Sequence, residues 1–321
     1  MISNLLKNKI SIDNSKMTFM FSGRVAINIL SKKFKKNRIV LIPKYICNVV
    51  DMAFEKEYKI IRYGVDEKFE PNIDELIYSI NNNKVDILLL ASLYGSGEFI
   101  NELYDHKSKL YKAIKQKKLE VIIDFAQDFY RINSLTLEYK NYHYIFSFND
   151  KSFMGSMGSI IVSNTDLSNI VYKQLSVAQN IFLLKNYLIK VVNCKIPLLL
   201  KAYQLLRGIK NKKIIKMEYE FSTCKVFPYT YDNYKISSIQ LFFALIGIFR
   251  LKVYYKNKCK YLNIHKDFMQ NRFVDTSAYI IVKGSDFQTN KFKPPYAYYN
   301  NQYDSLYPNL KIIHNKGFCD K

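Results

Sequence analysis

Two neighbouring stretches decide the fold of this chain: LEVIIDFAQDFY at Leu119–Tyr130 and YIFSFNDKSFMGSMGSIIVS at Tyr144–Ser163. Each contains a short apolar run, Val121–Ile123 in the first stretch and Tyr144–Phe146 in the second. Short runs of β-branched and aromatic residues are typical of buried strands. The first run ends directly at a carboxylate, Asp124. The sequence therefore predicts two buried strands, the first with an acid at its carboxyl end.

A lysine follows the second strand. The chain passes from Ser147 to Lys151 and then into the small-residue patch Gly155–Ser159. A lysine can hold an aldehyde cofactor as a Schiff base, and a carboxylate such as Asp124 can keep a pyridinium nitrogen protonated. The alternatives are a solvated Lys151 and an Asp124 that caps the segment after its strand. The pattern indicates a cofactor site and leaves those alternatives open.

Strands and helices alternate on the amino-terminal side of these stretches. Apolar strands are expected at Ile39–Ile42 and Val85–Leu90, and helices from about Cys47, after a cap at Asn72, and at roughly 100–116. This alternation is typical of an α/β fold with a mostly parallel sheet between helices. Ligands of such sheets gather at the carboxyl ends of the strands, where Asp124 is expected to lie.

The segment SGRVAI at Ser22–Ile27 predicts a helix that begins with two small residues and an arginine. The exposed N–H groups of a helix start attract anions, so Gly23 and Arg24 are candidates for binding phosphate. An ordinary helix start with a solvated Arg24 is the alternative.

Composition narrows the class of protein. The 321 residues carry 49 basic and 27 acidic side chains, a net charge of +22, which favours anionic partners. No nucleic-acid-binding motif is found, and the scattered histidines and five cysteines form no metal-binding pattern. The cysteine spacing, the lack of a signal peptide and the lack of an apolar run of about 18 residues predict a cytoplasmic protein. We expect no bound metal and no nucleic-acid partner.

Residues 171–216 differ from the rest, because they are apolar and basic without any acidic residue. Pro197 is expected to divide the segment into two helices. A basic amphipathic helix pair suits a peripheral contact with acidic lipid at the inner face of the membrane. A helical insert that packs on a partner subunit is the alternative.

Seven pieces of the chain resemble, in the same order, the DegT-type nucleotide-sugar aminotransferases, which are pyridoxal 5'-phosphate (PLP) enzymes of fold type I. The pieces are SGRVAI (22–27), VLIPKYICNVVDMAF (40–54), YGVDEKFEPNIDEL (63–76), LLLASLYG (88–95), VIIDFAQ (121–127), IFSFNDKSFMGSMGSIIVS (145–163) and YDNYKISSIQLFFAL (231–245). They extend over most of residues 17–250. The resemblance implies a large cofactor-binding domain at 1–250, with 171–216 as its insert, and a small C-terminal α+β domain at 251–321.

The resemblance also implies roles for particular residues. Lys151 and Asp124 would be catalytic: Lys151 binds PLP and moves protons, and Asp124 partners the pyridinium nitrogen. The other expected cofactor-binding residues are Gln127 at the ring hydroxyl, Gly23, Arg24 and Ser147 at the phosphate, Tyr45 at the ring, and Asn233 and Lys235 from the neighbouring subunit of a homodimer. Cys47 stands where many relatives have a stacking aromatic, so Tyr45 or Tyr94 is expected to take that place.

The function implied is transamination of a nucleotide-linked keto-sugar, with glutamate as amino donor, in the biosynthesis of a surface polysaccharide. The SFNDK loop at 147–151 is one residue shorter than the family pattern. A catalytically degenerate relative that binds a nucleotide sugar or a membrane partner without transamination is therefore the alternative.

Overall fold

The computed structural model describes residues 16–34, 38–54, 57–66, 68–135, 139–148, 158–185 and 233–248, together with four strands beyond residue 270. The elements of the first part are β1 (Met17–Met20), α2 (Gly23–Lys33), β2 (Ile39–Pro43), α3 (Asn48–Phe54), β3 (Lys59–Tyr63), α4 (Ile73–Asn82), β4 (Ile87–Ala91), the short 3-10 helix η2 (Leu93–Gly95), α5 (Phe99–Tyr104), α6 (Lys109–Lys117), β5 (Glu120–Phe125), η3 (Phe129–Ser134), β6 (Tyr142–Ser147) and β7 (Ser159–Ser163). Residues 177–185 and 238–248 are also helical.

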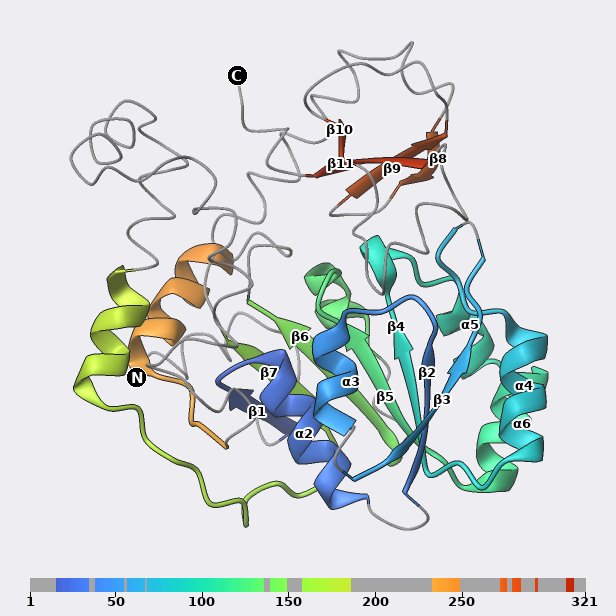
Figure 1. Ribbon diagram of the computed structural model, residues 1–321, viewed down its shortest axis with the longest axis horizontal. Helices are drawn as coiled ribbons and strands as arrows, with labels where there is room; N and C mark the ends of the chain where they lie inside the picture. The colour runs from blue at the N-terminus through green and yellow to red at the C-terminus, as the bar shows by residue number, and fades with distance from the viewer. Residues whose placement is uncertain are drawn as a thin grey trace.

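A seven-stranded sheet in the order β1-β7-β6-β5-β4-β2-β3 forms the centre of this part (Figure 1). Five neighbouring strands, β3, β2, β4, β5 and β6, run parallel, and β7 runs antiparallel to both β6 and β1. The α/β fold with a mostly parallel sheet is therefore confirmed. The strand order reverses between β2 and β4, and the loops that follow those two strands leave the sheet at the same edge.

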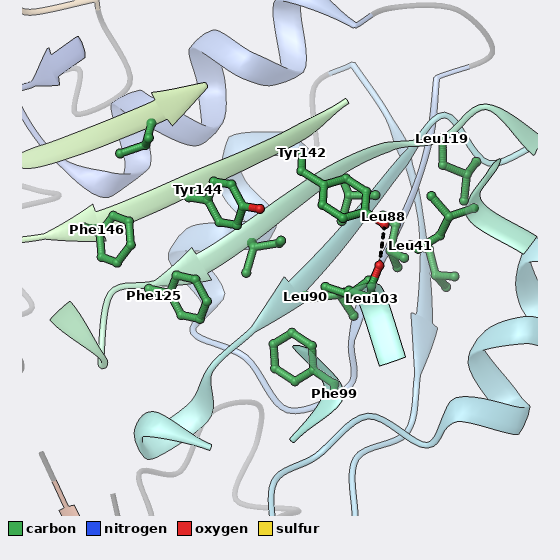
Figure 2. Close-up of a cluster of buried hydrophobic side chains, with 14 of the residues drawn as sticks. Leu41, Leu88, Leu90, Phe99, Leu103, Leu119, Phe125, Tyr142, Tyr144 and Phe146 are labelled. Carbon is green, nitrogen blue, oxygen red and sulfur yellow. Dashed lines mark hydrogen bonds between the residues drawn. The ribbon is translucent and has the colours of Figure 1, made fainter. Parts of the chain in front are cut away.

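Helices cover both faces of the sheet. One core joins α2 and α3 to one face and includes Val25, Ile29 and Ile145. The other core joins α4, α5 and α6 to the opposite face. Figure 2 shows part of this second core, where the Tyr142 hydroxyl donates a hydrogen bond of 3.1 Å to the Leu103 carbonyl. The central strands β2 and β4 are apolar along their whole length, as is typical of strands that are covered on both faces.

Side-chain caps explain where several helices begin. The expected cap is confirmed at α4, where the Asn72 side chain accepts a hydrogen bond of 3.1 Å from the Glu75 amide. The single helix expected at about 100–116 is wrong, because α5 ends at Tyr104 and α6 begins at Lys109. Ser108 caps the new helix by accepting a bond of 2.9 Å from the Tyr111 amide. A serine that can cap in this way competes with helix continuation.

A second sheet lies in the C-terminal part of the chain. It has four antiparallel strands in the order β10-β11-β9-β8, which are β8 (Arg272–Asp275), β9 (Tyr279–Lys283), β10 (Phe292–Lys293) and β11 (Leu310–His314). The division into domains at residue 250 stays a prediction. Of the insert at 171–216, residues 171–185 are described. Pro197 and the expected second helix lie outside the described residues.

Candidate functional site at the carboxyl edge of the sheet

Asp124 and Ser147 lie at the carboxyl ends of neighbouring strands and on the same face of the sheet. Asp124 of β5 pairs with Ile145 of β6, and Ser147 follows two residues later. Side chains alternate along a strand, so Ser147 shares the face of Ile145, which belongs to the core beneath α2. Registered neighbours in a parallel pair share a face as well. Both polar side chains therefore lie on the α2 side of the sheet.

A hydrogen bond orients the acid. Oδ1 of Asp124 accepts from the Ala126 amide at 2.8 Å, and the Asp124 carbonyl accepts from the Ser92 amide at 2.9 Å. The side chain is partly buried and is adjacent in register to the small side chain of Ala91 on β4. The carboxylate is thus held at the edge of the sheet beside a residue that fills little space.

The start of α2 lies over the same part of the sheet. A Cβ placed on Gly23 would lie 4.0 Å from Cγ2 of Ile145. Ser22 caps the helix: its Oγ accepts from the Val25 amide at 3.3 Å and its carbonyl accepts from the Ala26 amide at 3.0 Å. The amides of Gly23 and Arg24 have no helical acceptor. The helix start expected at Ser22 is confirmed, and it directs two amides and its positive dipole end toward the edge that carries Asp124 and Ser147.

The Arg24 side chain is partly exposed and forms no ion pair with any described residue. It lies on the first turn of α2, so the sequence-predicted pair Gly23 and Arg24 is brought to the same edge as Asp124 and Ser147.

Ser159 is a further candidate residue for the site, which the sequence pattern alone did not single out. It is completely buried, and its Oγ has no hydrogen-bond partner among the described residues. It pairs with Ser147 on one side and with Met20 on the other, three residues before α2 begins. Directly opposed residues of antiparallel strands lie on the same face, so the two serines are neighbours. A buried hydroxyl without a partner is costly, so Ser159 is a candidate for binding a polar ligand.

Lys151 lies outside the described residues, but the two ends of its loop are described. The Phe148 amide donates a bond of 2.8 Å to the Gly158 carbonyl. Gly158 has a φ of 135°, and a Cβ there would lie 2.9 Å from Cδ1 of Ile236 and 3.1 Å from the Phe148 ring. Only glycine fits where the chain re-enters the sheet. The loop that carries Lys151 therefore begins and ends at the edge that carries Ser147 and Ser159.

Gln127 and Tyr45 are both buried near this edge. Gln127 is 7% exposed and lies in the turn after β5. Tyr45 is 2% exposed and follows β2, with its ring centroid 5.5 Å from that of Phe69. Tyr45 thus packs in the core under α2, and its contact with a cofactor ring stays a prediction. The side chain of Tyr94 is outside the described part of the structure.

Asn233 and Lys235 lie beside β1 of the same chain. Lys235 forms a β-bridge with Met20, and its amide donates to the Lys173 carbonyl at 2.9 Å. The Asn233 carbonyl accepts from the Lys173 amide at 2.8 Å. Lys235 therefore reaches the sheet two residues before Ser22. Their expected role at a neighbouring subunit's site stays a prediction.

Other polar residues at this edge hold the loops in place. The buried carboxylate of Glu70 accepts bonds from the amides of Glu98 at 2.9 Å and Phe99 at 3.1 Å and also from the Gly97 amide, at the start of α5. Burial raises the pKa of Glu70, and these amide bonds oppose the rise. Arg131 pairs with the buried Asp128 in η3. These contacts fix the loops after β4 and β5.

No group of three or more histidine, cysteine or acidic side chains that could hold a metal ion occurs in the described ranges. None of the described helices is long and apolar enough to cross a membrane.

Comparison with known proteins gives a likeness of fold without a likeness of sequence. No protein-family model matches the chain. No curated protein matches it in sequence. Among solved structures, an archaeal alanine:glyoxylate aminotransferase superposes with a TM-score of 0.53 at 13% identity, covering 99% of this chain and 76% of that one.

Two further solved structures are similar to the same degree. The histidinol-phosphate aminotransferase from Clostridium acetobutylicum has a TM-score of 0.53 at 11% identity, covering 99% of this chain and 86% of that one. A PLP-bound C–S lyase from Staphylococcus hominis has a TM-score of 0.53 at 11% identity, covering 96% and 75%. At these identities the likeness shows the fold alone, and the expected fold, PLP fold type I, is confirmed.

Proposed function

We propose that this chain is a PLP-dependent aminotransferase. The observation that carries the proposal is the convergence, at the carboxyl edge of a fold type I sheet, of an oriented carboxylate, an unpartnered buried serine and the open amino end of a helix. Asp124, Ser159 and Gly23 come from β5, β7 and α2. Three separate elements thus supply the three kinds of group that a phosphorylated pyridine cofactor requires.

The described residues fit the cofactor at both ends. Ser147, Ser159 and the amides of Gly23 and Arg24 would hold its phosphate, because hydroxyls and helix-start amides donate hydrogen bonds to phosphate oxygens. Asp124 would accept a hydrogen bond from the protonated ring nitrogen and so keep that nitrogen protonated. When bound, PLP supplies an electron-accepting ring that stabilises negative charge on a substrate carbon. The unpartnered Oγ of Ser159 is the observation that supports this fit.

Lys151 is proposed as the residue that binds the cofactor and carries protons to and from the substrate. Lys151 is three positions after Phe148, with two residues between them, and an extended chain spans at most about 3.5 Å per residue. Its amine acts as a base when neutral and returns the proton as an acid. Asp124, whose Oδ1 is held by the Ala126 amide, would support this step by accepting a hydrogen bond from the ring nitrogen.

A nucleotide-linked keto-sugar is the proposed amino acceptor and glutamate the proposed donor, in the biosynthesis of a surface polysaccharide. The ordered resemblance of seven sequence pieces to the DegT-type enzymes supports this substrate class. The net charge of +22 is also favourable for a diphosphate-linked substrate. A homodimer with shared sites, formed with Asn233 and Lys235, belongs to the same proposal.

Absorbance of the purified protein tests the cofactor and the lysine together. With added PLP the protein should show a band at roughly 410–430 nm, typical of lysine-bound PLP. Lys151→Ala should lose that band, whereas Lys109→Ala, which changes an exposed lysine on α6, should keep it. A colourless protein that takes up no PLP would refute the proposal.

Amino transfer is tested separately with glutamate and nucleotide-linked keto-sugars as substrates. Release of 2-oxoglutarate that depends on the sugar would support the full proposal. A protein that binds PLP through Lys151 but transfers no amino group to any such sugar would support the alternative, a degenerate relative that binds without transamination.

A further inference from the structure

The helix at residues 177–185 carries an apolar stripe that points away from the core. Val177, Ile181 and Leu184 are 75%, 60% and 38% exposed. Their spacing of four and three residues places them on one side of a helix. Leu183, on the opposite side, is 5% exposed and belongs to the core beneath α2. The helix thus buries one side and leaves a second apolar side in solvent.

Exposed apolar side chains are concentrated in this part of the chain. The large hydrophobic side chains that are exposed among the described residues are Met52, Tyr78, Val171, Val177, Ile181, Leu184 and Phe242. Four of these seven fall between residues 171 and 184, and Val171 is 86% exposed. Single exposed apolar residues are ordinary, but a group on one segment indicates a binding surface.

The stripe is held on a firm support. Ser176 and Gln179 form a reciprocal cap at the start of the helix, with bonds of 2.9 Å and 3.2 Å between each amide and the other's side-chain oxygen. Just before it, Lys173 pairs through its backbone with Asn233 and Lys235. The apolar stripe therefore occurs on an anchored helix.

The charges around the stripe have a single sign. Lys173 and Lys185 are exposed on either side of it, and no acidic residue occurs between Asp166 and Glu218. Lys185 lies four residues after Ile181, one turn further along the helix. A partner that fits this surface must therefore combine an apolar region with negatively charged groups.

We propose that the stripe of Val177, Ile181 and Leu184 docks this protein onto the surface of an anionic lipid bilayer. The three apolar side chains enter the boundary between headgroups and acyl chains, and the flanking lysines meet the lipid phosphates. The contact is peripheral, since no described helix can span a bilayer. The proposal rests on this surface and does not depend on the bound cofactor.

A second copy of the chain is a poorer occupant. A two-fold symmetric contact brings the same surface of both copies together. Lys173 and Lys185 of each copy would then face lysines, with no acidic residue of this segment to balance them, and like charges in an interface oppose association.

Co-sedimentation of the full chain with vesicles tests the proposal. The protein should sediment with phosphatidylglycerol vesicles, and not with phosphatidylcholine vesicles, and raising the salt to about 0.5 M should release it. Ile181→Gln should weaken sedimentation by at least about tenfold, because it removes an apolar side chain from the bilayer. Tyr78→Gln, which alters a side chain 70% exposed on α4, is the matched control and should bind as the parent does.

Melting temperature and size-exclusion chromatography complete the test. The Ile181→Gln variant should melt and elute as the parent does. Unchanged vesicle binding in this variant would overturn the proposal. A large fall in melting temperature would overturn it too, because the stripe would then be packed within the chain. A change from dimer to monomer would assign the stripe to a contact between copies instead.

Discussion

Replacing Ser159 with alanine should stabilise the protein without cofactor and weaken cofactor binding. The Ser159 hydroxyl is completely buried and has no hydrogen-bond partner among the described residues. Burying a hydroxyl in this state costs about 1–3 kcal/mol. The small space that alanine leaves offsets part of the gain, so the free energy of unfolding should rise by about 1 kcal/mol. For a chain of this size that corresponds to a rise in melting temperature of about 2 °C.

The same substitution should have the opposite effect on the cofactor. A hydrogen bond to a charged group contributes about 1.5–3 kcal/mol, so loss of the proposed bond from Ser159 to the phosphate should weaken PLP binding by about 10- to 100-fold. Thermal melting of the apoprotein and titration of PLP by absorbance measure the two effects. Inorganic phosphate serves as a second probe, and its protective effect on melting should fall in the variant.

Ser163→Ala is the matched control, at the other end of β7. The Ser163 Oγ lies 2.8 Å from Nδ1 of His143 and accepts a bond of 2.9 Å from the Thr165 amide. Its loss should destabilise the protein by about 1 kcal/mol or more and leave PLP binding unchanged. If Ser159→Ala destabilises the apoprotein as Ser163→Ala does, the Ser159 hydroxyl has a partner, and the argument that it awaits a phosphate is wrong.

Three further predictions concern the support around the site. Gly158→Ala should destabilise the protein by about 2 kcal/mol or more in denaturant unfolding, because a φ of 135° strains alanine and its Cβ would lie 2.9 Å from Ile236. A stability like that of the parent would show that the loop end adjusts freely. Arg62→Met should lower the free energy of unfolding by about 2–3 kcal/mol in the same assay, because the Asp51 carboxylate, 1% exposed, would lose the guanidinium that lies 2.9 Å away. An unchanged free energy of unfolding would contradict this prediction. Burial raises the pKa of Glu70 in the folded protein above its ordinary value of 4.5. The contribution of Glu70 to the free energy of unfolding is therefore complete below pH 4.5. It is lost as the pH rises through the pKa of Glu70 in the folded protein. Glu70→Gln, which cannot ionise, should therefore cost less at pH 7 than at pH 4 in urea unfolding, and the reverse order would refute the assignment.

The sequence was sufficient to predict those parts of the fold that depend on local pattern. Val121–Ile123 and Tyr144–Phe146 are strands because continuous apolar runs between turns have few other solutions in an α/β protein. Ser22 and Asn72 begin helices because their side chains accept from the amide three residues on. Asp124 was located correctly, since a carboxylate that ends a buried strand must lie at the sheet edge.

Features that depend on pairing between distant strands were not predictable in this way. The neighbour of β6 on its far side is β7, which is antiparallel, and no local pattern states that Ser159 will be placed between Ser147 and Met20. The orphan hydroxyl was therefore missed, although Ser159 stands in the small-residue patch after Lys151. Lys235 likewise lies beside β1 because it forms a bridge with Met20, which is distant in sequence. Local sequence periodicity does not predict such a long-range contact.

The pairing of Met20 has a consequence for how the protein is made. Met20 is joined to Ser159 through the sheet and to Lys235 through a bridge, yet it leaves the ribosome before either of them. Contacts between such distant residues form late, since a long loop must close before they gain anything. The parallel strands β2 to β6 can pair with one another before β7 has been synthesised, and β1 can pair with β7 only afterwards. A nascent chain that ends before Ser159 already contains Asp124 and Ser147. It still lacks Ser159 and the pairing of β1 with β7, which positions the start of α2 because β1 leads directly into that helix. The proposed phosphate site should thus be completed only after Ser159 and the rest of β7 have left the ribosome.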